Sequence, residues 1–275
     1  FQNHPFERNP LNRAEPLRLE RFKVMKTRYT EDAIYYGDAY LTGNASVFGT
    51  ADNMTINVNA RTRRGTWINF PMYGPKTIAE EGFITFKTED IEDLFEESGI
   101  NFSGVNLSLN FDVTPDARVK LIFDDQIGDE ITARGEGLMR IGLDNYGDIS
   151  LNGTYRVTEG VYNFVMGPIR QNFFISPGGT VQWTGNPFSA QLNIETFYIT
   201  TANLGLVMAD VIENRATQNE EIFSYLRLVG DMTRPEISFD LGVPRGSEAS
   251  RAVINRIRAD QEELNRQFFS LLLTR

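Results

Sequence analysis

The chain of 275 residues contains no cysteine and only one histidine, His4. The absence of cysteine excludes disulfide bonds, thiol nucleophiles and cysteine-ligated metal sites. His4 lies in a proline-rich opening segment, where an incidental role is far more common than catalysis or metal binding. No apolar run approaches the roughly 20 residues of a membrane-spanning helix. Because Phe1 is no start residue and no signal peptide precedes it, we expect a segment of a longer protein.

Acidic residues outnumber basic residues. Lys and Arg number 27 against 37 Asp and Glu, which gives a net charge of −10. This balance argues against nucleic-acid binding, which needs basic side chains against phosphates. The sequence also lacks a phosphate-binding Gly-Lys-Ser/Thr loop and a dinucleotide fingerprint. We therefore expect no nucleic-acid partner, no cofactor and no bound metal.

Alternation of apolar and polar residues is the strongest pattern that the sequence contains. In residues 105–113, Val, Leu, Leu, Phe and Val alternate with Asn, Ser, Asn and Asp. The same period returns through residues 135–183, with a turn expected at Glu159-Gly160 between two strands. Period two places one face of each strand against apolar groups and the other against water. Many short strands at regular spacing predict a mainly β fold.

Two stretches change to helical spacing. Residues 89–98 predict one short helix, and residues 247–265 predict a helix near the end of the chain. We therefore expect three parts: an irregular segment with an edge strand at 1–34, a β domain at 35–246, and a helix with a terminal apolar run at 247–275. That last run, 268–273, is expected to be either a buried final strand or an exposed edge that awaits a partner.

Two acidic clusters are candidates for a catalytic or a metal site. Asp124-Asp125 and Asp129-Glu130 could act as paired carboxylates, but they fall in an expected loop where solvated acids are ordinary. Residues 144–148 (DNYGD) lack the ligand spacing and the closing glutamate of a calcium loop, so a hairpin turn is the better interpretation. The sequence thus predicts a protein that is not an enzyme.

The apolar strand faces leave two arrangements open. Either two sheets pack face to face, or one curved sheet leaves its concave face free for an apolar ligand. The residues alone do not decide between them.

Longer strings carry a specific resemblance. DVTPDARVKLIFDDQIGDEITARGEGLMRIGLDNYGDISLNGTYRVTEGVYNFV resembles the C-terminal domain of the TamB family, named after the translocation and assembly module. So do FFISPGGTVQWTGNPFSAQLNIETFY, GDAYLTGNASVFGTADNMTINVNARTRRGTWINFP, LVGDMTRPEISFDLGVP and LNRQFFSLLL. The resemblance spans residues 35–275, and its style is closest to versions from the Bacteroidota.

The resemblance implies a long sheet curled into a hydrophobic trough, the β-taco of AsmA-like and bridge-like lipid transfer proteins. The apolar strand faces would then line a groove for lipid. The expected lining is Ile56, Val58, Leu107, Leu109, Phe111, Val119, Leu121, Phe123, Ile141, Ile149, Leu151, Tyr155, Tyr162, Phe164, Trp183, Leu192, Ile194, Ile237 and Phe239. The terminal apolar run would dock a partner through Phe268, Phe269, Leu271, Leu272 and Leu273.

The function implied is that of a periplasmic protein anchored in the inner membrane by a segment outside this sequence. It would carry phospholipid to the outer membrane, assist outer-membrane protein assembly, or do both, with a TamA/BamA-type barrel as partner. The alternative is an assembly factor that templates client strands by β-augmentation and transports no lipid.

Overall fold

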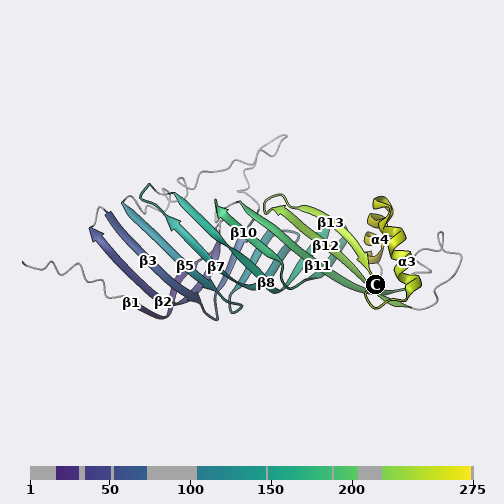
Figure 1. Ribbon diagram of the computed structural model, residues 1–275, viewed down its shortest axis with the longest axis horizontal. Helices are drawn as coiled ribbons and strands as arrows, with labels where there is room; N and C mark the ends of the chain where they lie inside the picture. Colours follow the sequence, from purple (N-terminus) through teal and green to yellow (C-terminus); the bar gives the residue numbers. More distant parts are fainter. Residues whose placement is uncertain are drawn as a thin grey trace, which may run out of the picture.

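A single large sheet makes up most of the molecule in the computed structural model, which describes residues 17–30, 35–50, 53–72, 104–146, 148–187, 189–203 and 219–273. Along the long axis, strands follow one another from β1 at one end to β13 at the other, where two helices lie (Figure 1). The prediction of a mainly β fold built on a curled sheet is confirmed. The expected helix at 89–98 lies outside the described residues.

The strands of the first half are β1 (Leu17–Thr27), β2 (Tyr36–Thr50), β3 (Asn53–Thr62), β4 (Trp67–Pro71), β5 (Val105–Val113), β6 (Arg118–Asp124) and β7 (Asp129–Leu143). Those of the second half are β8 (Ile149–Met166), β9 (Ile169–Ile175), β10 (Thr180–Gly185), β11 (Ala190–Ala202), β12 (Glu220–Asp231) and β13 (Glu236–Gly242). The helices that follow are α3 (Glu248–Arg258) and α4 (Gln261–Leu273).

In three places two short strands lie one after the other along the same long strand, like the two halves of a bent strand. β3 pairs with residues 41–50 of β2, and β4 pairs with residues 36–38 of the same strand. In the same way β5 and β6 share β7, and β10 and β9 share β8. The sheet is therefore folded along its length into a first wall (β3, β5, β10) and a second wall (β4, β6, β9). The long strands β2, β7, β8 and β11 run through both walls.

Threonine side chains hold the chain where it crosses from one wall to the other. Thr62 and Thr114 share a hydroxyl hydrogen bond of 3.1 Å, and the Thr114 backbone N–H donates to Thr62 Oγ1 at 2.8 Å. Thr66 Oγ1 accepts from the Tyr40 N–H at 3.0 Å. These bonds satisfy backbone groups that the bend removes from the strand ladder.

In β8 the bend is a bulge. Arg134 pairs with Glu159 while Gly135 pairs with Val157, so Thr158 is the extra residue, and its hydroxyl donates to the Arg134 carbonyl at 3.1 Å. The expected turn at Glu159-Gly160 is therefore wrong, because β8 continues to Met166. A one-residue bulge moves the apolar set from odd to even positions while the strand keeps its direction.

Most neighbouring strands are antiparallel, as short hairpins require. The exceptions are β3 with β5 and β4 with β6, which run parallel. The connection between β4 and β5 passes through residues 73–103, which lie outside the described part of the chain.

The two walls turn their apolar faces toward each other. Leu121 and Ile131 of the second-wall side belong to the same core as Val181 and Leu192 of the first-wall side. At the bend the inner residues are small and buried: Ala39, Ala60, Ala117 and Ala133. Small side chains let the two walls approach each other along this line, as a curled sheet requires.

The expected helix at 247–265 is two helices. Ser247 caps α3, since its hydroxyl accepts from the Ser250 N–H, and α4 begins after Asp260 and continues to Leu273. The apolar run at 268–273 is therefore helical and not a strand. The buried residues of α4 are Leu264, Gln267, Phe268, Leu271 and Leu272, and the three- to four-residue steps from Leu264 to Phe268 and Leu271 are those of one helix face.

Candidate functional site

Rows of paired apolar residues cross the strands of the first wall. Residues directly opposite each other in a ladder lie on the same face of a sheet. One row joins Ile56, Leu107, Leu143 and Ile149, and the next joins Val58, Leu109, Ile141 and Leu151. We call the face that carries these rows the inner face, and the opposite face the outer face.

The structure places the expected lining residues on this inner face. In the first wall Phe111 pairs with Met139, Met139 pairs with Gly153, and Gly153 pairs with Trp183. Tyr155 pairs with Val181, and Val181 pairs with Leu192. In the second wall Leu121 pairs with Ile131 and that with Tyr162. The remaining expected residues, Val119, Phe123, Phe164, Ile194, Ile237 and Phe239, fall on the same face by alternation and register.

Burial along the inner face changes from one end of the molecule to the other. Tyr155, Leu192 and Ile194 are buried, whereas Ile56, Val58, Leu107, Leu109 and Ile141 are only half-buried. The expectation that Ile237 faces an apolar interior is wrong in part, because 46% of this side chain is exposed. It lies on the edge strand β13, where its pairing partner Leu228 is buried but nothing described covers Ile237 itself.

The contrast expected between Leu109 and Asn110 does not show in burial, since every residue of β5 is half-buried. The two residues still lie on opposite faces. Leu109 pairs with Val58 and Ile141, while Asn110 donates to Asn59 Oδ1 at 3.1 Å and accepts from Arg140 Nε at 3.0 Å on the outer face. The first wall is thus polar outside and apolar inside, and its apolar side is partly open.

Aromatic rings form a continuous row along the second wall. Ring centroids lie 6.1 Å apart for Phe123 and Tyr162, 5.7 Å for Tyr162 and Phe164, and 5.8 Å for Phe164 and Phe173. The row then reaches α4, where Phe268 lies 6.1 Å from Phe173. Edge-to-face pairs at these spacings pack well against aliphatic chains and offer no fixed hydrogen-bond partner.

Few polar groups reach the inner face. Burial raises the pKa of the Tyr155 hydroxyl, which has no hydrogen-bond partner within the described residues. Burial also raises the pKa of Tyr162, whose hydroxyl donates to Asp129. Both phenols therefore stay neutral, and the trough carries no charge at either position.

The acids at 124–130 serve the β6–β7 hairpin. Asp124 Oδ1 accepts from the backbone N–H groups of Gln126 and Ile127 at 2.9 and 3.3 Å. Glu130 is 2.7 Å from Lys120 Nζ. Burial raises the pKa of Asp129, the Tyr162 hydrogen bond opposes that rise, and the nearby Asp124 adds to it. Among the described residues no group of three His, Asp or Glu side chains could hold a metal ion.

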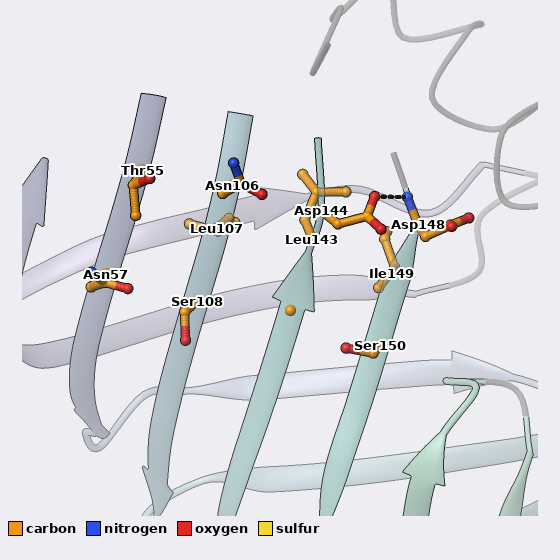
Figure 2. A pocket seen from close by; sticks show the side chains of 11 residues that line it. Thr55, Asn57, Asn106, Leu107, Ser108, Leu143, Asp144, Asp148, Ile149 and Ser150 are labelled. Atoms are coloured by element: carbon orange, nitrogen blue, oxygen red, sulfur yellow. Dashed lines mark hydrogen bonds between the residues drawn. The ribbon is translucent and has the colours of Figure 1, made fainter. Parts of the chain in front are cut away.

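A depression of about 310 Å³ lies over β3, β5, β7 and β8 (Figure 2). Outer-face polar residues line it together with residues of the inner row: Thr55, Asn57, Asn106, Ser108 and Ser150 on the polar side, and Leu107, Leu143 and Ile149 on the apolar side. Gly142 adds no side chain to the lining. At its rim Asp144 Oδ1 accepts from the N–H groups of Tyr146 and Asp148 at 2.9 and 3.0 Å, which confirms the hairpin turn expected there.

A stripe of outward aromatics was missed from the sequence. Phe174 pairs with Phe197 and that with Tyr225, all on the outer face, and 53% of Phe174 is exposed. The signal was present in the adjacent aromatics Phe173-Phe174 and Phe197-Tyr198. In a strand two neighbours cannot share a face, so one of each pair must point outward.

The residues expected to dock a partner lie on α4. Phe268, Leu271 and Leu272 are buried at 0%, 1% and 2% exposure, Phe269 is half-buried, and Leu273 is 60% exposed. Three of the five therefore contact a partner only if α4 leaves its present position. Their role in docking stays a prediction.

Comparison with known proteins agrees with these features. The family model of the TamB C-terminal domain matches residues 11–275. A search of curated proteins gave no match. Within the described residues no helix has the length and apolar character needed to cross a bilayer. The family acts in the bacterial envelope and is not a known enzyme family. With nearly the whole sequence covered by that one model, the chain belongs to the family of TamB C-terminal domains.

Proposed function

We propose that the inner face of the folded sheet shields phospholipid acyl chains on their way to the outer membrane. The observation that carries this proposal is the apolar inner face of the first wall, where Ile56, Leu107 and Leu109 are half-buried and not fully packed within the described residues. A water-filled groove with such a lining would be costly, because each methylene exposed to water costs about 0.8 kcal/mol.

The lining also suits movement along the trough. Neighbouring strands repeat the same apolar row roughly every 4.8 Å, so an acyl chain meets equivalent surfaces as it advances. Neutral phenols and aromatic rings add contact area without a charge that would hold a headgroup at one place.

Photocrosslinking tests the proposal directly. A photoreactive amino acid at Leu109 should label phospholipid when the full chain is incubated with vesicles, whereas the same group at Asn110 should not. The two positions are adjacent and both half-buried, and they lie on opposite faces of the sheet. Equal labelling from both, or labelling from Asn110 alone, would contradict a lipid path on the inner face.

The family membership supports an envelope role at the outer membrane, in lipid transport or protein assembly. We propose a periplasmic location for this part, an inner-membrane anchor elsewhere in the protein, and a TamA/BamA-type barrel as partner. The barrel should co-purify with the protein extracted from envelopes. Loss of co-purification when Leu273 and Phe269 are both replaced by Ser would support a docking role for these two residues, which lie nearest the surface.

The β-augmentation alternative has one observation in its favour. β1 pairs only with β2 among the described strands, and its Leu17, Phe22 and Val24 are 62%, 54% and 46% exposed. A client strand could extend the sheet at this edge. Native mass spectrometry separates the two functions, since bound phospholipid is expected for the trough and an added peptide strand without lipid for the alternative.

A further inference from the structure

One section of the trough already has an occupant, and it is helix α4. The ring of Phe268 lies 4.5 Å from that of Phe239 and 6.1 Å from that of Phe173, centroid to centroid. Both wall residues belong to the inner face, and Phe268 is fully buried between them. The helix therefore fills the volume that continues the open trough of the first half.

A polar side chain on the inner face marks where α4 ends. The inner positions of β9 are Ile169, Gln171, Phe173 and Ile175, and Gln171 is the one amide among apolar residues. Its Nε2 donates to the Leu272 carbonyl at 2.7 Å. The last carbonyls of a helix lack intrahelical donors, so Gln171 satisfies a group that only a seated α4 presents.

Helix α3 is attached to the sheet by a different kind of contact. Arg258 binds Asp240 of β13 with both nitrogens, Nε to Oδ1 at 2.6 Å and Nη2 to Oδ2 at 2.8 Å. Asp260 ends the short link between the helices, and its carboxylate caps α4 through the Glu262 and Glu263 N–H groups. α3 buries Ile254 and Ile257 in the same core and is also tied to β13 by this two-bond ion pair, whereas the buried face of α4 is mainly apolar and reaches the sheet through the Gln171 bond.

We infer that the trough section beneath α4 is itself an acyl-chain site, with α4 as its resting occupant, an inference that rests on the function proposed above. Apolar contact is non-directional, so an acyl chain that buries the same apolar area can take the place of the contacts that α4 makes with the sheet. α4 swings out about residues 259–260 while α3 keeps its ion pair. The displaced helix then presents Phe268, Leu271 and Leu272, the residues expected to dock a partner.

The test uses the full chain and vesicles of phosphatidylethanolamine that carry a photoactivatable group in one acyl chain. A chain with Gln171→Cys and Leu273→Cys is joined by a short, cleavable bismaleimide, which reacts nowhere else because the protein has no cysteine. We expect lipid label on β5 in both forms. Label on β9 and β13 is expected only after the linker is cleaved.

A single substitution gives an independent measurement. Gln171→Leu removes the hydrogen bond to α4 and keeps the wall apolar, so label on β9 and β13 should rise about five-fold over wild type. The control is Gln191→Leu, an exposed glutamine on the outer face of β11, which should change nothing. Equal label on β9 and β13 in the locked and cleaved forms would show that lipid reaches these strands without displacing α4, and would overturn the inference.

The failures are distinguishable. Label on β5 with none on β9 or β13 in any form overturns the inference and leaves the lipid trough standing. Absence of label from β5 as well overturns the proposed function, and the site beneath α4 with it.

Discussion

Leu109 and Leu138 are leucines on neighbouring strands of one sheet, but they face opposite ways. Leu109 lies on the half-buried inner face, while Leu138 is 76% exposed on the outer face. We expect Leu109→Arg to weaken phospholipid binding at least about 10-fold, because a cation among acyl chains is strongly disfavoured. Leu138→Arg should leave binding unchanged. Lipid occupancy by native mass spectrometry checks both variants, and equal losses would indicate a general charge effect in place of a lipid path.

The Asp129 carboxylate predicts a pH dependence of stability. Burial raises its pKa in the folded state above the ordinary value of 3.8. Stability from this group is therefore greatest below pH 3.8 and falls as pH rises through the higher folded pKa. Asp129→Asn should stabilise the fold by about 0.5 kcal/mol at neutral pH, a small gain because solvent screens a half-exposed carboxylate.

Urea denaturation of wild type and Asp129→Asn at neutral pH and near pH 3.5 measures this difference. The gain should be confined to neutral pH. Asp124→Asn is not a neutral control, since Asp124 accepts two backbone hydrogen bonds in the hairpin. A larger gain at the lower pH would reverse the sign and show that Asp129 is stabilised as the anion.

At the scale of the element, the bulge at Thr158 decides which face the end of β8 presents. Deleting Thr158 would turn Tyr162 and Phe164 outward, because side chains alternate with a period of two. We expect the chain to lose its cooperative thermal transition. Deleting Asn145 from the exposed β7–β8 turn removes one residue without touching a ladder and should lower the melting temperature by a few degrees at most. Circular dichroism with thermal melting distinguishes the two.

Elements that follow one period were predictable from the sequence. The alternation in β5 predicts its inner face, and the register confirms it for Leu107, Leu109 and Phe111. The bulge was not predictable, because a one-residue change of phase looks the same as a turn followed by a new strand. Helix α4 was half missed because Phe268–Leu273 is a short apolar run, and such runs fit a strand as well as a buried helix.

At the scale of the whole molecule, the resemblance supplied what periodicity could not. Alternation alone did not decide between a sandwich and a curved sheet, and on general grounds it favoured the sandwich slightly. The structure shows that both descriptions capture part of it, since one sheet folds back on itself and closes at the α4 end while it stays half-open at the β3–β5 end. The position of α4 inside the trough had no signal in the sequence except Gln171, an amide on an apolar strand face.

The parallel pairing of β3 with β5 has a consequence for the order of folding. Asn59 and Asn110, which face each other across it, are 51 residues apart in the chain, whereas β5 to β11 are linked to their neighbours by short turns. Closing such a long loop slows the step that needs it. The meander from β5 onward should therefore form first and serve as the template on which β3 and β4 assemble, although they are synthesised earlier. Pulse-labelling hydrogen exchange during refolding should show amides of β7 and β8 protected before the amides that bond β3 to β5, and the reverse order would place the nucleus at the other end.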